Sequence, residues 1–425
     1  MRSTSRAIVS GVAVTALLVA MLLAAAGAGL FAWQPSYRRL FAHGGDSGRQ
    51  AADLAPDKPA EICPVARRLL SVSENEWQGV LARIQPLAPP ETSSSFCLHW
   101  LRLHGAEARL PGHEGLPGKG PPGHETDDDR IKILRLLCDS DAGQSFFGSP
   151  TLERTRHGVR FPTALRFPLN KDPAQESHRD QCLAALAELG LPLSWPLRLG
   201  RETFTLRDVL SDSIAEFHLG QAEISWTTVA YALYLPPERE WRNRYDERTT
   251  FDDLLGELLG RPLERASCGG THLFQALAVL ARADAARPVL GDDARHQLWE
   301  RLRTLVDLAV RGQEPDGSWR SDWHALLGTD SVRRPTDADP SAAISRLVAT
   351  GHLAEFLLYL PSELRPPDDC PRRAGLWLQA QLRAASAEVL KRDFCPYTHA
   401  VCALKQLMFV ESKPSELPIM GIGKR

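Results

Sequence analysis

The sequence lacks an excess of charge of either sign. Its 50 Lys and Arg residues nearly balance its 52 Asp and Glu residues, so the formal net charge is −2 over 425 residues. A protein that binds nucleic acid through the phosphates needs a basic surface. We therefore expect no nucleic-acid partner.

Cysteine is sparse, and two familiar zinc-binding spacings are absent. Eight cysteines in the whole chain are too few for a disulfide scaffold. The chain has no C-x-x-C and no H-E-x-x-H motif, so the two strongest sequence signals for zinc are missing. Runs of β-branched residues are also scarce whereas Leu and Ala are abundant, which favours helices.

One long hydrophobic run is present, near the N-terminus. Residues Ala7 to Trp33 carry no charged side chain, and a helix needs about 20 residues to span a bilayer. We expect a single-pass anchor in the lipid bilayer. The body of the protein should be extracytoplasmic, because Arg2, Arg6 and the amino terminus slightly outweigh the arginines after the run. A signal peptide cleaved near Ala26–Ala28 is the alternative.

Four segments follow the anchor. Residues 34–61 are polar and predict a flexible spacer. Residues 62–172 predict N-terminal helices and a loop-rich segment that is part of the main domain or packed on it. Residues 173–411 have regular helical periodicity and predict that main domain, and residues 412–425 form a tail.

The regular part predicts a succession of helices. Ser177–Asp180 and Thr250–Asp253 both have the pattern of a capping box, which marks a helix start. Apolar residues at helical spacing predict one helix after Thr250 and others over Ser177–Leu189, Leu206–Leu219, Ser225–Leu235, Cys268–Ala283, Asp292–Arg311, Ala342–Leu360, Arg373–Lys391 and Pro396–Val410.

Every second predicted helix carries a landmark near its start. The landmarks are 48, 46, 80 and 47 residues apart, and the long step contains an additional connection from Gly312 to Ser341. A period of about 40–50 residues made of two helices predicts a helical-hairpin repeat. The repeat alone allows either a closed ring or an open solenoid. The landmarks are His178, Trp226, His272, His352 and His399.

The additional connection contains the motif Gln313–Trp319, which reads QEPDGSW. Asp316 and Gly317 favour a tight turn, Trp319 can pack over a helix end, and Gln313 can bond to backbone groups at helix termini. The motif resembles the Q-x-x-D-G-S-W repeat of the squalene cyclase and protein prenyltransferase superfamily. The resemblance implies an all-α fold, an α/α toroid of about five to six helical hairpins, in which these residues are structural and not catalytic.

A second resemblance covers Cys268 to Leu407. It rests on Cys268–His272, Gln313–Trp319, Thr350–Phe356 and Tyr397–Ala400, and it is to an uncharacterised family of membrane-anchored, planctomycete-type proteins. The chain departs from the known toroid enzymes. It has no D-x-D-D motif and no Cys-His dipeptide, so we do not expect squalene cyclisation.

The landmark histidines are the candidate catalytic residues. In a toroid the inner helices run parallel, so residues near their starts converge on one mouth of the central pocket. A helix N-terminus disfavours the imidazolium ion, and neutral imidazole can act as a base or bind a metal. The candidates are His178, Glu223, His272, His352, Glu355 and His399.

A subset of these residues is the candidate metal site. Cys268 and His272 are four residues apart and share a helical face, and thiolate with imidazole favours Zn²⁺. His352 is the third candidate ligand, with Glu355 as a supporting carboxylate. The alternative is that each histidine only caps a helix or packs.

Two functions remain open from the sequence. The first is a membrane-anchored extracytoplasmic enzyme with a central pocket for a glycan or isoprenoid-type substrate. The second is a binding or scaffold protein whose toroid carries out no chemistry.

Overall fold

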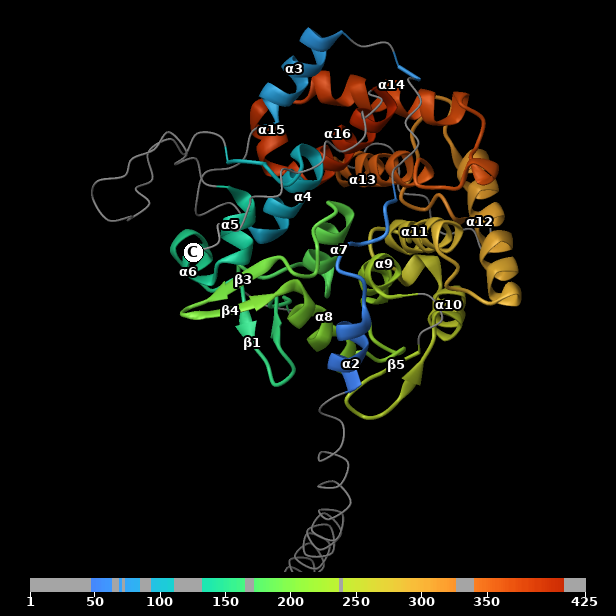
Figure 1. Ribbon diagram of the computed structural model, residues 1–425. Helices are drawn as coiled ribbons and strands as arrows, with labels where there is room; N and C mark the ends of the chain where they lie inside the picture. The colour runs from blue at the N-terminus through green and yellow to red at the C-terminus, as the bar shows by residue number, and fades with distance from the viewer. Residues whose placement is uncertain are drawn as a thin grey trace, which may run out of the picture.

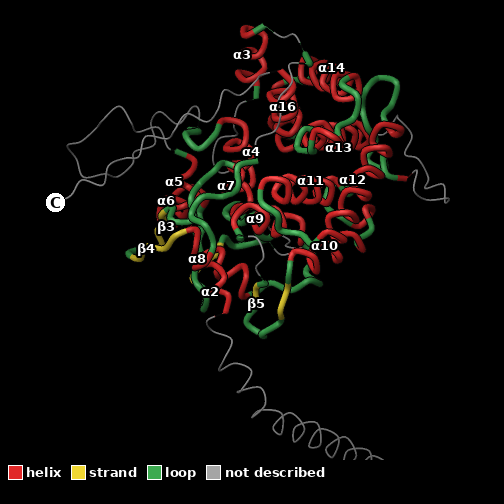
Figure 2. The backbone as a smooth tube through the Cα atoms, turned by 45° about the vertical axis from the view of Figure 1, so that its right-hand side comes forward, coloured by secondary structure: helices red, strands yellow, loops and turns green. Residues whose placement is uncertain are grey.

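The computed structural model describes residues 47–62, 69–70, 73–84, 93–110, 132–164, 172–236, 240–325 and 340–408. These residues are mostly helical, which confirms the all-α class (Figure 2). The described strands form three short antiparallel ribbons. They are β1 (Glu153–Arg154) with β2 (Val159–Arg160), β3 (Pro196–Leu199) with β4 (Glu202–Thr205), and β5 (Trp241–Arg242) with β6 (Arg248–Thr249).

Six helices form a ring of contacts. Each helix packs against the next one of the six in chain order, and the last packs against the first, which closes the ring (Figure 1). Helix α9 shows why these helices are internal, since it is apolar around its whole circumference and all but one of its residues are buried. The six are α4 (Ser94–His104), α7 (Gln181–Glu188), α9 (Ile224–Tyr234), α11 (Thr271–Ala286), α13 (Pro340–Leu357) and α16 (Phe394–Met408).

Other helices pack on the outside of the ring. Helix α12 is amphipathic, and the predicted stripe of Leu298, Leu302, Leu305 and Leu308 is buried. Its partner in the ring is α11. The remaining described helices of eight or more residues outside the ring are α2 (Ser47–Leu54), α3 (Glu74–Arg83), α6 (Ser140–Phe147), α8 (Leu206–Ala215), α10 (Phe251–Gly260) and α14 (Asp369–Ala384); α5 (Ile133–Cys138) and α15 (Ala387–Arg392) are shorter.

The predicted spacer over residues 34–61 is wrong for the part that the structure describes. Residues Ser47–Leu54 form α2, which packs against α8. Ala52 and Ala55 are buried, and the Arg207 guanidinium donates hydrogen bonds to both of their carbonyl oxygens. Small alanine side chains allow this close helix packing, so a segment that looks like a linker in composition belongs to the folded body.

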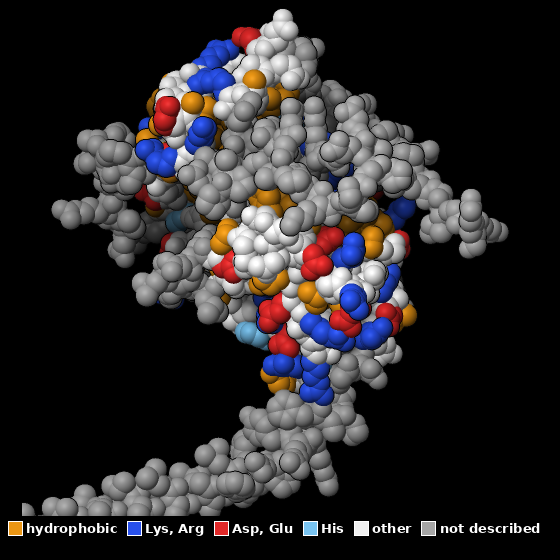
Figure 3. Space-filling model, turned by 90° about the vertical axis from the view of Figure 1, so that its left-hand side faces the viewer, with side chains coloured by type: hydrophobic (Ala, Val, Ile, Leu, Met, Phe, Trp, Pro, Cys, Tyr) orange, Lys and Arg blue, Asp and Glu red, His pale blue; other side chains and the backbone are white. Residues whose placement is uncertain are grey.

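The predicted anchor, Ala7–Trp33, and the predicted tail, residues 412–425, lie outside the described residues. Within the ranges that the structure does describe, no helix combines the length and apolar character needed to cross a membrane. On the face shown in Figure 3, the described basic and acidic side chains are intermixed, in keeping with the near-zero net charge.

Three predicted helix boundaries differ from those in the structure. The Ser177–Asp180 capping box does not form; α7 begins at Gln181, and the buried Glu176 carboxylate accepts hydrogen bonds from the N–H groups of Asp180 and Cys182. The predicted helix Arg373–Lys391 is interrupted, because Ser386 caps a new helix, α15. Helix α13 begins at Pro340, a residue suited to the first turn.

The Gln313–Trp319 motif connects three helices. The Gln313 Nε2 donates to the carbonyl oxygens of Gly317, at 2.9 Å, and of Cys370 in α14, at 2.8 Å. The buried Trp319 donates its ring N–H to Ala309 O in α12, at 2.6 Å, and its backbone N–H to Thr350 Oγ1 in α13, at 2.9 Å. The motif is therefore placed to hold α12, α13 and α14 together.

Gly317 provides a test of this motif. Its φ of +94° is unfavourable for other residues, and an added Cβ would lie 2.5 Å from Arg373 O. We expect Gly317→Ala to lower the free energy of unfolding by about 1–3 kcal/mol in urea denaturation. Gly256→Ala is the control, since Gly256 lies in α10 with nothing within 4 Å of an added Cβ, and it should be neutral or slightly stabilising. Equal losses in both variants would contradict the assigned role.

Candidate functional site

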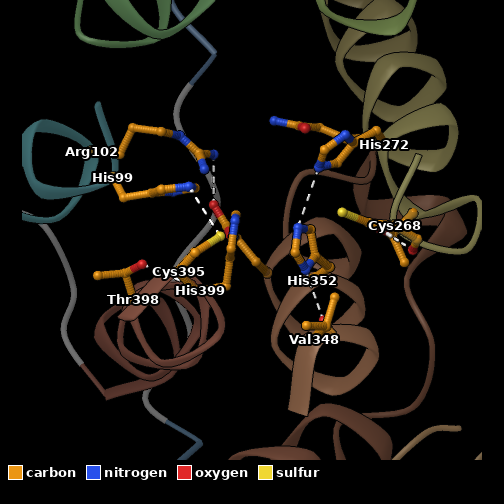
Figure 4. Close-up of polar contacts among 12 residues, drawn as sticks. His99, Arg102, Cys268, His272, Val348, His352, Cys395, Thr398 and His399 are labelled. Atoms are coloured by element: carbon orange, nitrogen blue, oxygen red, sulfur yellow. Dashed lines mark hydrogen bonds and ion pairs between the residues drawn. The ribbon is translucent and has the colours of Figure 1, made fainter. Parts of the chain in front are cut away.

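Four ring helices bring histidine and cysteine side chains together. His99 comes from α4, His272 from α11, His352 from α13, and His399 with Cys395 from α16; Cys268 lies in the turn before α11 (Figure 4). All four histidines are buried, whereas both cysteines are exposed. We call these six residues the histidine–cysteine cluster. The two sulfur atoms point toward the histidine rings (Figure 4).

Cys268, His272 and His352 form the first half of the cluster, here called the Cys268 group. One ligand atom from each of the three lies within 4.8 Å of the other two. The Nε2 atoms of His272 and His352 are 3.3 Å apart. His352 Nδ1 lies 2.7 Å from Val348 O, which can only accept, so Nδ1 carries the proton and Nε2 keeps its lone pair.

Local backbone geometry places Cys268 beside His272. The predicted helix over Cys268–Ala283 in fact begins at Thr271, and Cys268 precedes it with a φ of 53°. Such a conformation is unusual for a residue other than glycine. The two glycines that follow, Gly269 and Gly270, also have positive φ, so the chain turns tightly between the thiol and the imidazole.

His99, Cys395 and His399 form the second half of the cluster, here called the Cys395 group. Their ligand atoms also lie within 4.8 Å of one another. His99 Nε2 is 3.3 Å from Cys395 Sγ, and His399 Nδ1 is 3.0 Å from Glu355 Oε2. The two halves are in contact, because the rings of His352 and His399 stack with their centroids 3.7 Å apart.

The four buried histidines favour the neutral form. Burial is the first cause in each case, and it holds the pKa values of His99, His272 and His399 well below the ordinary range and lowers the pKa of His352 to about 4. Mutual repulsion between the imidazoles adds to the effect on His99, His272 and His399. The prediction that a helix N-terminus keeps these histidines neutral is wrong for His352, which lies in the C-terminal half of α13.

A buried ionic network contacts the cluster through Glu355 and His399. Arg102 in α4 donates to Glu188 Oε2 at 2.9 Å and to Glu355 Oε1 at 2.7 Å, and all three side chains are at least 91% buried. Gln275 donates to the other oxygen of Glu188 at 3.0 Å. Glu355, a predicted catalytic residue, is thus held between Arg102 and His399, which suits it to orienting the His399 ring.

The predicted residues His178 and Glu223 lie at the edge of the cluster. His178 Nδ1 is 3.3 Å from Glu223 Oε2, and both side chains are 21% exposed. The His178 ring stands edge-on to His272, with centroids 5.1 Å apart. His178 precedes α7 and does not lie in its first turn, yet it reaches the neighbourhood that the period predicted.

Sequence reasoning missed His99, Cys395 and Arg102. Arg102 and His99 lie on α4, a short apolar segment that the period count did not include. A signal for Cys395 was present, since Cys395 and His399 repeat the four-residue spacing of Cys268 and His272. No protein-family model, curated protein or solved structure matches this chain. The two resemblances therefore remain predictions.

Proposed function

We propose that this chain is a zinc-dependent enzyme whose ion is held by the Cys268 group. The observation that carries the proposal is the convergence of one thiol and two neutral imidazoles, with ligand atoms within 4.8 Å of one another. Two nitrogens bound at about 2.0–2.1 Å to tetrahedral zinc lie roughly 3.3 Å apart. The Nε2 atoms of His272 and His352 are separated by 3.3 Å.

The donor set suits zinc more than the harder cations. Thiolate and imidazole together bind borderline metals, whereas Mg²⁺ and Ca²⁺ prefer oxygen ligands. The bond from His352 to Val348 O orients the imidazole and leaves Nε2 free to bind, as backbone carbonyls do for many metal-bound histidines.

Three protein ligands are typical of catalytic zinc sites, which keep a fourth position open. The ion would supply a Lewis acid that polarises a carbonyl or phosphoryl group or activates water. Cys268 is the exposed residue of the group, whereas both of its histidines are buried. The ring centroids of His178 and His272 are 5.1 Å apart. The His178–Glu223 pair can therefore accept a proton from a nucleophile bound beside His272.

The proposal includes the surrounding architecture. The closed ring of six helices, the outer helices and the bracing Gln313–Trp319 motif support an α/α toroid with the active centre at one mouth. Residues 7–33 would anchor this toroid in the bilayer with its body outside the cytoplasm. A glycan or isoprenoid-type substrate would enter at the exposed thiols.

Zinc analysis of the purified full-length chain tests the proposal. We expect the wild type to contain zinc and His272→Ala to lose the ion of the Cys268 group, because a catalytic three-ligand site rarely survives with two ligands. His296→Ala is the control, since His296 is exposed on α12, and it should keep the wild-type content. Hydrolysis of a panel of chromogenic esters, glycosides and phosphodiesters should fall together with the zinc content in His272→Ala. It should not fall in His296→Ala. Equal zinc content in both variants would refute the assignment.

A further inference from the structure

The two halves of the cluster repeat one arrangement. In each half a cysteine precedes a histidine by four residues, Cys268 with His272 and Cys395 with His399. In each half a second histidine comes from a neighbouring ring helix, His352 from α13 in one and His99 from α4 in the other. The same three donor types therefore converge twice, in two groups that lie side by side (Figure 4).

We propose that the Cys395 group binds a second borderline divalent ion, of the Zn²⁺ class. The ligands are His99, Cys395 and His399, whose donor atoms lie within 4.8 Å of one another. The His99 Nε2 and Cys395 Sγ atoms are 3.3 Å apart. The assignment does not depend on the function proposed for the Cys268 group, because the two sets share no residue.

The surroundings of His399 suit a metal ligand more than a packed side chain. The histidines of protein zinc sites usually donate their second ring N–H to a carboxylate or carbonyl group. His399 Nδ1 donates to Glu355 at 3.0 Å, which leaves Nε2 as the nitrogen for an ion. Glu355 is in turn held by the buried Arg102 at 2.7 Å. Burying such a charged network is costly, and a purely apolar core would not need it.

The donor types also define the ligand class. A cysteine thiol, once deprotonated, and two neutral imidazoles prefer Zn²⁺ over oxygen-seeking cations. The rings of His352 and His399 are stacked with their centroids 3.7 Å apart, so the Cys395 group and the Cys268 group lie side by side.

Zinc titration of the full-length chain, followed by native mass spectrometry, tests the second site. We expect two ions in the wild type, one in Cys268→Ser, one in Cys395→Ser and none in the double variant. Both cysteines are exposed, and serine is nearly isosteric, so the variants should fold; circular dichroism verifies this. Titration with Co²⁺ adds an independent readout, because each serine variant should lose about half of the sulfur-to-cobalt charge-transfer absorbance.

The outcomes separate the two proposals. A wild type that binds one ion, lost in Cys268→Ser and kept in Cys395→Ser, would overturn the second site and leave the proposed enzyme intact. One ion lost only in Cys395→Ser would support the second site and refute the Cys268 group as a zinc ligand set. An ion count unchanged by either substitution would overturn both.

Discussion

Replacing Arg102 with methionine is expected to lower the free energy of unfolding by about 3–5 kcal/mol. Arg102 is the cation between two buried carboxylates, Glu188 at 2.9 Å and Glu355 at 2.7 Å. Its loss leaves both acids in a poorly hydrated interior with only Gln275 and His399 as described partners. Methionine retains much of the length of the side chain, so the loss reports chiefly on charge. Urea denaturation at neutral pH measures it.

Two further variants make this prediction specific. Arg303→Met removes an exposed arginine that pairs with Glu300 on α12, and such a pair is worth at most about 1 kcal/mol. Adding Glu188→Gln and Glu355→Gln to Arg102→Met should recover part of the lost stability, because no uncompensated charge then remains. A loss below 1 kcal/mol for Arg102→Met alone would show that the network is not energetically coupled to folding.

Acidification of the metal-free chain is expected to destabilise it steeply between about pH 6.5 and pH 4. Unfolded histidine titrates near pH 6.5, whereas burial lowers the pKa of His352 to about 4 and holds those of His99, His272 and His399 well below their ordinary value. The unfolded chain therefore binds more protons in this window, and stability falls as pH falls. Each histidine contributes up to about 1.4 kcal/mol per pH unit.

Buried acids act in the opposite direction. Burial, with the nearby charge of Asp180, raises the pKa of Glu176 to about 8, so its contribution to stability is present at low pH and is lost as pH rises through 8. Burial also raises the pKa values of Glu188 and Asp212. We therefore compare the slope of the free energy of unfolding against pH in the wild type and in a variant. In the variant, one buried histidine is replaced by a residue that cannot titrate.

His272→Gln is such a variant. We expect a smaller slope of the free energy of unfolding against pH for His272→Gln than for the wild type, both treated with a chelator. The difference between pH 5 and pH 6.5 should be about 1 kcal/mol per pH unit. His296→Gln replaces an exposed histidine on α12 and should leave the slope unchanged. Identical slopes in all three proteins would mean that His272 is not held neutral by the fold.

The helical period in the sequence predicted five of the six ring helices. The landmarks His178, Trp226, His272, His352 and His399 lie on or directly before five ring helices, α7, α9, α11, α13 and α16. A period of apolar residues is readable because the ring helices bury most of their described residues. The sixth helix, α4, was missed, because its buried residues form one short apolar segment between loop-rich regions.

Side-chain contacts explain the other differences. Glu176 caps α7 in place of Ser177, and Arg207 fixes α2 to the body through two carbonyl oxygens. Neither interaction has a local sequence pattern. The pairing of His272 with His352, 80 residues apart, follows from the packing of the successive ring helices α11 and α13. The meeting of His99 with Cys395, 296 residues apart, follows from ring closure by α16 on α4. The repeated Cys-x-x-x-His spacing was the one local signal for the complete cluster.

Metal binding by the histidine–cysteine cluster underlies both proposals. Anomalous X-ray diffraction from crystals of the zinc-treated protein, recorded on both sides of the zinc absorption edge, tests it most directly. We expect one peak bounded by Cys268, His272 and His352 and a second bounded by His99, Cys395 and His399. A map without an anomalous peak within bonding distance of these six side chains would contradict it.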